Sequence, residues 1–132
     1  MTHVLIVDDD ADIRMTMRLL LEDMGGYIVL EATDGVSGLE MVRTSEDPLV
    51  VLLDLLMPQL DGLGVLRAVA TDECLATRHA YVLVTVSRQG FSVELPANLQ
   101  GVVPVVAKPF DITVLLDTVA EAARRLHQPD NV

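Results

Sequence analysis

The sequence predicts an α/β fold in which five strands alternate with helices, written (βα)₅, around a doubly wound parallel sheet. Runs that are apolar throughout, such as Leu49–Leu53, are typical of strands buried on both faces. Between these runs apolar residues recur at helical spacing. Alternating strands and helices favour crossover connections, and hence a parallel sheet with helices on both faces. The chain has 132 residues, 51% of them apolar, which suits one compact core and leaves no room for a separate output module.

The predicted strands are short apolar segments bounded by polar or turn-forming residues. They are, in chain order, His3–Val7, Tyr27–Ala32, Leu49–Leu53, Ala80–Val84 and Val102–Ala107. The first, third, fourth and fifth are each followed by an acidic, hydroxyl or lysine residue. The sheet is therefore expected to carry its polar chemistry at one edge.

The helices are predicted from apolar stripes and from their end signals. The first helix is expected to end at Gly25-Gly26, because glycine favours the residue after a helix. Asp34, Asp61-Gly62 and Asp111 mark the starts of the next predicted helices. Between Ser87 and Gly101 no helical stripe is sustained, so the fourth helix is expected to be short or irregular. We expect one domain over residues 1–127 and a flexible tail over 128–132.

Charge and composition exclude several classes of protein. A net charge of −11 opposes direct binding to nucleic acid, whose phosphates attract basic surfaces. No apolar run is long enough to span a membrane, and the amino terminus lacks the pattern of a secretory signal. A single cysteine, Cys74, cannot form an intramolecular disulfide, which favours a cytoplasmic location. We therefore expect no membrane partner and a monomer or weak homodimer.

Polar residues that follow four different strands are predicted to meet. Asp8-Asp9, Asp54, Thr85 and Lys108 each lie at or just after the end of an apolar segment. In a parallel sheet these ends share one edge, where ligands bind. Carboxylates from the first and third strands would suit Mg²⁺, which prefers oxygen ligands. The ion would relieve repulsion between the carboxylates and would keep Asp54 ionised, as a nucleophile must be.

Together these motifs resemble the receiver domain of response regulators in two-component signalling, of the chemotaxis-receiver type. The resemblance runs through Val4–Asp10, Asp54–Pro58, Asp61-Gly62, Thr85 and Lys108–Phe110. It implies a flavodoxin-like fold with strand order 2-1-3-4-5. It also implies a signalling domain that catalyses only its own phosphorylation and dephosphorylation. Its expected partners are a sensor histidine kinase or phosphotransfer protein and an unidentified downstream effector.

The resemblance also implies a role for each site residue. Asp54 would be the phosphoacceptor, taking a phosphoryl group from a phosphohistidine. Mg²⁺, or Mn²⁺ in its place, would be held by Asp8, Asp9, Asp54 and the main-chain carbonyl of Leu56. Thr85 would move toward the phosphoryl group and Lys108 would pair with it. The Lys108-Pro109 peptide bond is expected to be cis.

Three positions depart from the usual receiver pattern. Val86 stands where a small residue is usual, and Val105 stands where an aromatic ring usually couples the site to the outer face. Leu56 cannot hold an attacking water by a hydrogen bond, so we expect a long-lived phosphoryl group. Two alternatives remain open. The protein could be a phosphatase of the haloacid-dehalogenase type with Asp8 as nucleophile, or an adaptor that acts without phosphorylation.

Overall fold

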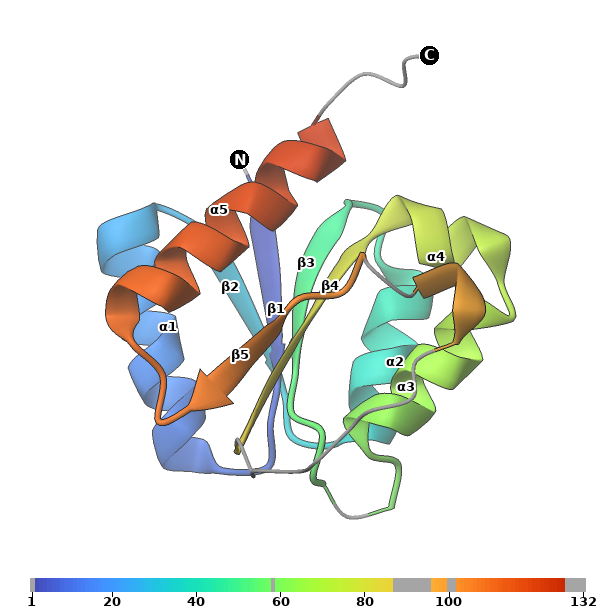
Figure 1. Ribbon diagram of the computed structural model, residues 1–132, viewed down its shortest axis with the longest axis horizontal. Coiled ribbons are helices and arrows are strands. Elements are labelled where there is room, and N and C mark those ends of the chain that lie inside the picture. Colours follow the sequence, from blue (N-terminus) through green and yellow to red (C-terminus); the bar gives the residue numbers. More distant parts are fainter. Residues whose placement is uncertain (1, 58, 87–95, 100–101, 128–132) are drawn as a thin grey trace.

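A single five-stranded parallel sheet forms the centre of the protein (Figure 1). The computed structural model describes residues 2–57, 59–86, 96–99 and 102–127. The strand order is β2-β1-β3-β4-β5 and every neighbouring pair is parallel, which confirms the predicted fold class. The strands are β1 (His3–Val7), β2 (Ile28–Ala32), β3 (Leu49–Leu53), β4 (Ala80–Val86) and β5 (Val105–Lys108).

Helices cover both faces of this sheet (Figure 1). One face is covered by α1 (Ala11–Gly25) and α5 (Ile112–His127), and the other by α2 (Gly35–Thr44) and α3 (Gly62–Ala70), followed by the short α4 (Glu73–Arg78). Each layer encloses its own apolar cluster. No helix in the described residues is both long and apolar enough to cross a membrane.

Strand β3 shows why a continuous apolar run predicts a strand inside a parallel sheet. All five of its residues are buried, and it pairs with β1 on one side and β4 on the other. Val50 and Leu52 pack in the core beneath α1 and α5, whereas Val51 and Leu53 pack beneath α2 and α3. A strand with a core on each side has no solvent-facing positions, so its sequence does not alternate.

Aspartates begin five helices, including each one for which the sequence predicted an aspartate cap. Each carboxylate accepts hydrogen bonds from main-chain amides two or three residues further on, which satisfies donors that have no partner within the helix. The capping residues are Asp10, Asp34, Asp61, Asp72 and Asp111. The first helix ends as predicted, with Gly26 at a φ of 68°. Part of the acidic charge is therefore structural.

Four elements differ from the prediction. Strand β2 starts one residue later, at Ile28, and β4 continues through Thr85 to Val86. Helix α4 was not predicted, because its six residues are too few to show a helical stripe. Strand β5 starts at Val105 rather than Val102, because Pro104 has no N–H to donate to the ladder. Pro104 still offers its carbonyl to the Leu83 amide, at 2.9 Å. Of the irregular segment expected before β5, the described part contains a 3₁₀ turn, η1 (Ala97–Leu99), and residues 87–95 and 100–101 lie outside the description, as does the predicted tail 128–132.

No motif surrounds His79 in the sequence, which by itself favours a solvated ring, but in the structure His79 is buried, with 3% exposure. Its Nδ1 accepts a hydrogen bond from the Leu49 amide at 2.9 Å, and its Nε2 lies 3.0 Å from the Val42 carbonyl. This pairing requires a neutral ring protonated at Nε2. Burial lowers the pKa of His79, and the Arg78 charge lowers it further, although the Val42 carbonyl opposes the shift. His79 therefore ties α2 to the amino ends of β3 and β4.

Candidate functional site

The site begins where β1 and β3 end side by side. Val7 and Leu53 are the last residues paired between these strands, so Asp8 and Asp54 are the next residues of each chain segment. The Asp54 amide donates to the Val7 carbonyl at 3.0 Å, and the Asp8 amide donates to the Ala32 carbonyl at 3.2 Å. Main-chain hydrogen bonds therefore hold both aspartates at the carboxyl edge of the sheet, as predicted.

Three carboxyl groups gather at this edge. One oxygen each from Asp8, Asp9 and Asp54 lie within 4.8 Å of one another. Asp8 is 1% exposed and Asp54 is 7% exposed, whereas Asp9 is open to solvent. A compact set of carboxylate oxygens with one open side fits a hard divalent cation that keeps some of its water.

Lys108, the only lysine in the chain, reaches the same cluster from the end of β5. Its Nζ lies 2.8 Å from Oδ2 of Asp8 and 3.3 Å from Oδ2 of Asp54. Burial by itself lowers the pKa of Lys108, but hydrogen bonds and charge attraction from the two aspartates outweigh it, so the pKa is raised overall. Lys108 is therefore a charged ammonium between the two buried carboxyl groups, and its peptide bond to Pro109 is cis, as the resemblance implied.

The environment of Asp54 disfavours its charge. Burial is the largest effect and raises the pKa of Asp54, and the nearby Asp8 raises it further. The Leu56 amide, which donates to Oδ1 of Asp54 at 3.1 Å, and the Lys108 ammonium both oppose this rise. The net shift is upward, so one ammonium does not fully offset the buried acidic groups. A further cation at the site would stabilise the ionised carboxylate.

Thr85 and Leu56 lie beside the carboxyl cluster, but neither side chain bonds to its carboxyl groups among the described residues. Thr85 is 4% exposed on β4, where it pairs in register with Ala107, one residue before Lys108. Among the described residues it makes no hydrogen bond to the carboxyl groups. Leu56 contacts Asp54 through its main-chain N–H, and the residue is 52% exposed.

Gly62 explains how α3 can start so close to the site. A Cβ at this position would lie 2.5 Å from the Asp54 carbonyl oxygen, so any side chain would displace the backbone that carries Asp54. The sequence predicts the Asp61-Gly62 pair as the turn that starts a helix, and the pair is one of the motifs that resemble a receiver. A glycine directly after the capping Asp61 is the sequence signal at this position. The close approach of Gly62 to Asp54 is a tertiary contact that the sequence does not show.

Val86 and Val105, two of the three positions that depart from the receiver pattern, lie on the surface. Val86 is 46% exposed at the end of β4, and Val105 is 55% exposed at the start of β5. Val86 pairs in register with Lys108, and Val105 pairs with Leu83. The exposed position of Val105 carries no ring that could turn inward.

Comparison with known proteins decides the family. The family model of the response regulator receiver domain matches residues 4–120. This chain belongs to that family. Receiver domains serve phosphorelay signalling and are generally not enzymes, which favours the receiver interpretation over the haloacid-dehalogenase alternative.

Named relatives agree with this assignment. The transcriptional regulatory protein CseB of Streptomyces coelicolor is 34% identical over 125 residues, which cover 94% of this chain and 50% of CseB. A CheY-like receiver domain protein from Methanospirillum hungatei has a TM-score of 0.79 and 28% identity, covering 96% of this chain and 98% of its own. This receiver chain spans about half the length of the curated relatives it matches.

The prediction that this protein does not bind nucleic acid directly is wrong. The DNA-binding dual master transcriptional regulator RpaA of Synechocystis is 32% identical over 130 residues, which cover 95% of this chain and 50% of RpaA. CseB is likewise named a transcriptional regulator. The charge argument concerned only the receiver half of such proteins, and the charge of one half does not decide what the whole regulator binds.

Proposed function

We propose that this receiver accepts a phosphoryl group on Asp54 from the phosphohistidine of a histidine kinase or phosphotransfer protein. The observation that carries the proposal is the Lys108 ammonium, which bridges the buried Asp8 and Asp54 within a cluster of three carboxyl groups. Burial beside Asp8 disfavours the charge on Asp54. The Lys108 ammonium supplies positive charge where the phosphoryl oxygens would lie. Among the described acidic groups, only this set combines close spacing with burial.

In the proposed step, a carboxylate oxygen of Asp54 attacks the phosphorus atom. The new O–P bond forms as the N–P bond of the phosphohistidine breaks, and the bonding electron pair returns to the imidazole nitrogen. Lys108 would then pair with a phosphoryl oxygen, and the Thr85 hydroxyl would donate to another after a local movement. The receiver would thus catalyse its own phosphorylation and dephosphorylation and no other reaction.

Asp8, Asp9 and Asp54 are the side chains that would hold Mg²⁺, together with the main-chain carbonyl of Leu56. The fit rests on the chemistry of the donors, which are all oxygen atoms and are grouped within 4.8 Å for the three carboxyl groups. Bound Mg²⁺ would neutralise charge on the transferring phosphoryl group. Mn²⁺, which also accepts oxygen ligands, would substitute.

The exposed Leu56 side chain supports a long-lived phosphoryl group. It lies two residues after Asp54 and offers no hydrogen-bonding group to an attacking water. We expect loss of the phosphoryl group to be slow, and a half-life of seconds in the presence of Mg²⁺ would contradict this.

The test is the intact mass of the protein after incubation with Mg²⁺ and acetyl phosphate. We expect one phosphoryl group that hydroxylamine removes, and none when a chelator is present. Asp54→Asn should abolish the adduct, whereas Asp23→Asn, which changes an exposed aspartate on α1, should not affect it.

Two other outcomes would overturn the proposal. No adduct on the unaltered protein would favour the adaptor that acts without phosphorylation. An adduct that survives Asp54→Asn but is lost in Asp8→Asn would place the nucleophile at Asp8 instead.

A further inference from the structure

The main-chain carbonyl of Asp8 has a partner outside the site described above. It lies one residue beyond the last pair of the β1 ladders, at Val7. The Nη1 atom of Arg14, on the first turns of α1, donates to this carbonyl oxygen at 2.7 Å. A hydrogen bond from a charged donor at this distance is among the stronger kinds in proteins.

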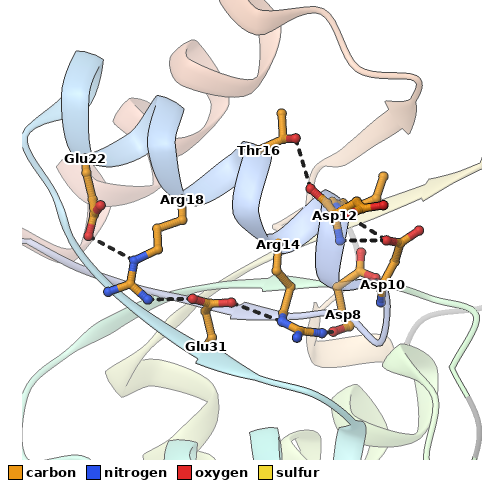
Figure 2. A network of polar contacts seen from close by, with 9 residues as sticks. Asp8, Asp10, Asp12, Arg14, Thr16, Arg18, Glu22 and Glu31 are labelled. Atoms are coloured by element: carbon orange, nitrogen blue, oxygen red, sulfur yellow. Dashed lines mark hydrogen bonds and ion pairs between the residues drawn. The ribbon is translucent and has the colours of Figure 1, made fainter.

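Arg14 is itself held by a second strand (Figure 2). Its Nε lies 3.0 Å from Oε1 of Glu31, which is on β2 and pairs in register with Ile6 of β1. Arg14 therefore links β2, through Glu31, to the segment that follows β1, through the Asp8 carbonyl. Arg18 binds the other oxygen of Glu31 and also Glu22, but its side chain is 42% exposed and does not contact Asp8.

Asp9 depends on this backbone for its position. Its side chain is exposed and makes no hydrogen bond among the described residues. Because the peptide group is planar, the direction of the Asp8 carbonyl fixes the plane of the Asp8–Asp9 peptide bond. On the far side, the Asp10 amide donates to Oδ1 of Asp8 at 2.9 Å. The Asp9 carboxyl group is thus placed by the main chain on either side of it.

We propose that Arg14 is a positioning residue that fixes the Asp8–Asp9 peptide and so aims the Asp9 carboxylate at the cation site. The proposal rests on the cation site of the proposed function. Arg14 does not touch the cation or the phosphoryl group. It acts through the Asp8 carbonyl, and Glu31 acts through Arg14.

The substitution Arg14→Lys separates the effect of the side chain's hydrogen-bonding geometry from the effect of its charge. It keeps the positive charge, but a single ammonium on a flexible chain does not reproduce the planar fork that binds Glu31 and the Asp8 carbonyl together. Arg18→Lys is the matched control. It makes the same substitution one turn further along α1, on an arginine that binds the same glutamate without contacting Asp8.

The experiment measures Mg²⁺ affinity by titration calorimetry on the unphosphorylated protein, beside the backbone order parameters of Asp9 and Asp10 in the metal-free protein. We expect Arg14→Lys to weaken Mg²⁺ binding about tenfold, the lower end of the range for residues that support metal ligands. The order parameters of Asp9 and Asp10 should fall from about 0.85 toward 0.6, the range of flexible backbone. Arg18→Lys should change the affinity by less than about twofold and leave both order parameters unchanged.

The two measurements distinguish failure of the positioning role of Arg14 from failure of the proposed cation site. Suppose that the unaltered protein binds Mg²⁺. The positioning role is then overturned if Arg14→Lys leaves the Mg²⁺ affinity unchanged, or if Arg18→Lys weakens it equally. If the unaltered protein binds no Mg²⁺, the cation site fails, and the order parameters alone judge whether Arg14 fixes the peptide. Unchanged order parameters in Arg14→Lys would then overturn the proposal.

Discussion

Two buried polar clusters lie at opposite ends of the same sheet and differ in how their polar groups are satisfied. At the amino end, the neutral ring of His79 accepts from the Leu49 amide and meets the Val42 carbonyl. The Tyr81 hydroxyl nearby donates to the Leu75 carbonyl at 2.9 Å. At the carboxyl end, Lys108 alone faces several carboxyl groups.

The difference separates polar burial that supports the fold from polar burial that supports a reaction. The amino-end cluster pairs neutral donors with neutral acceptors, which stabilises a buried polar group. The carboxyl-end cluster has three carboxyl groups with oxygens within 4.8 Å of one another and one ammonium, which contacts Asp8 and Asp54. Burial and, to a lesser degree, the neighbouring Asp8 raise the pKa of Asp54 and so disfavour its charged form, which an added cation would stabilise.

The largest expected effect is that of Lys108→Met. It leaves the buried Asp8 and Asp54 without their shared ammonium, and removing one partner of a buried ion pair typically destabilises a protein by about 3 kcal/mol or more. We expect the free energy of unfolding, measured by urea denaturation with a chelator present, to fall by about that amount. Added Mg²⁺ should restore part of it by binding the folded state. Arg67→Met, at an exposed arginine on α3, is the control, and a loss below about 1 kcal/mol for Lys108→Met would contradict the prediction.

His79→Leu should have the next largest effect. The substitution leaves the Leu49 amide and the Val42 carbonyl buried without their partner, which costs about 2 kcal/mol of stability. Phosphorylation by acetyl phosphate should be retained, because His79 lies at the far end of the sheet. His3→Leu is the control, since His3 is only partly buried and lies 3.9 Å from the exposed Asp47. Equal losses from the two histidine variants would refute a special role for His79.

Asp54→Asn should act in the opposite direction on stability. Because folding raises the pKa of Asp54, its ionised form is less favourable in the folded protein than in the unfolded chain. In metal-free protein at neutral pH we expect a gain of about 1 kcal/mol, as is common when a strained functional group is replaced. The gain should shrink as the pH falls through the raised pKa toward the unfolded value of about 3.9. Asp23→Asn should show neither the gain nor its loss at low pH.

The smallest effect is the pH dependence that His79 confers. Folding lowers the pKa of His79, so the unfolded chain binds a proton more readily than the folded protein. The stability from neutral His79 is complete above the unfolded pKa of about 6.5 and is lost as the pH falls from there toward the folded pKa. Unfolding measured at pH 7.5 and 5.5 should show a larger decrease for the unaltered protein than for His79→Leu. Parallel pH curves would contradict this.

The predictability of each element depended on how local its signal was. The predicted bounds of β1 and β3 match the structure, and an aspartate directly follows each of these apolar runs. Helix α4 was missed because six residues carry too little periodicity. His79 was misread because its partners, Leu49 and Val42, are 30 and 37 residues away in the chain.

By itself, the sequence determined the alternation of strands and helices, the caps, and the residue types at the strand ends. Those features follow from local apolar spacing and from the chemistry of single side chains. Only the tertiary structure decided that Lys108 lies 2.8 Å from Asp8, 100 residues away, that Gly62 must lack a side chain beneath Asp54, and that Arg14 holds the Asp8 carbonyl. These contacts depend on how separate elements pack, and packing sets distances that no single segment encodes.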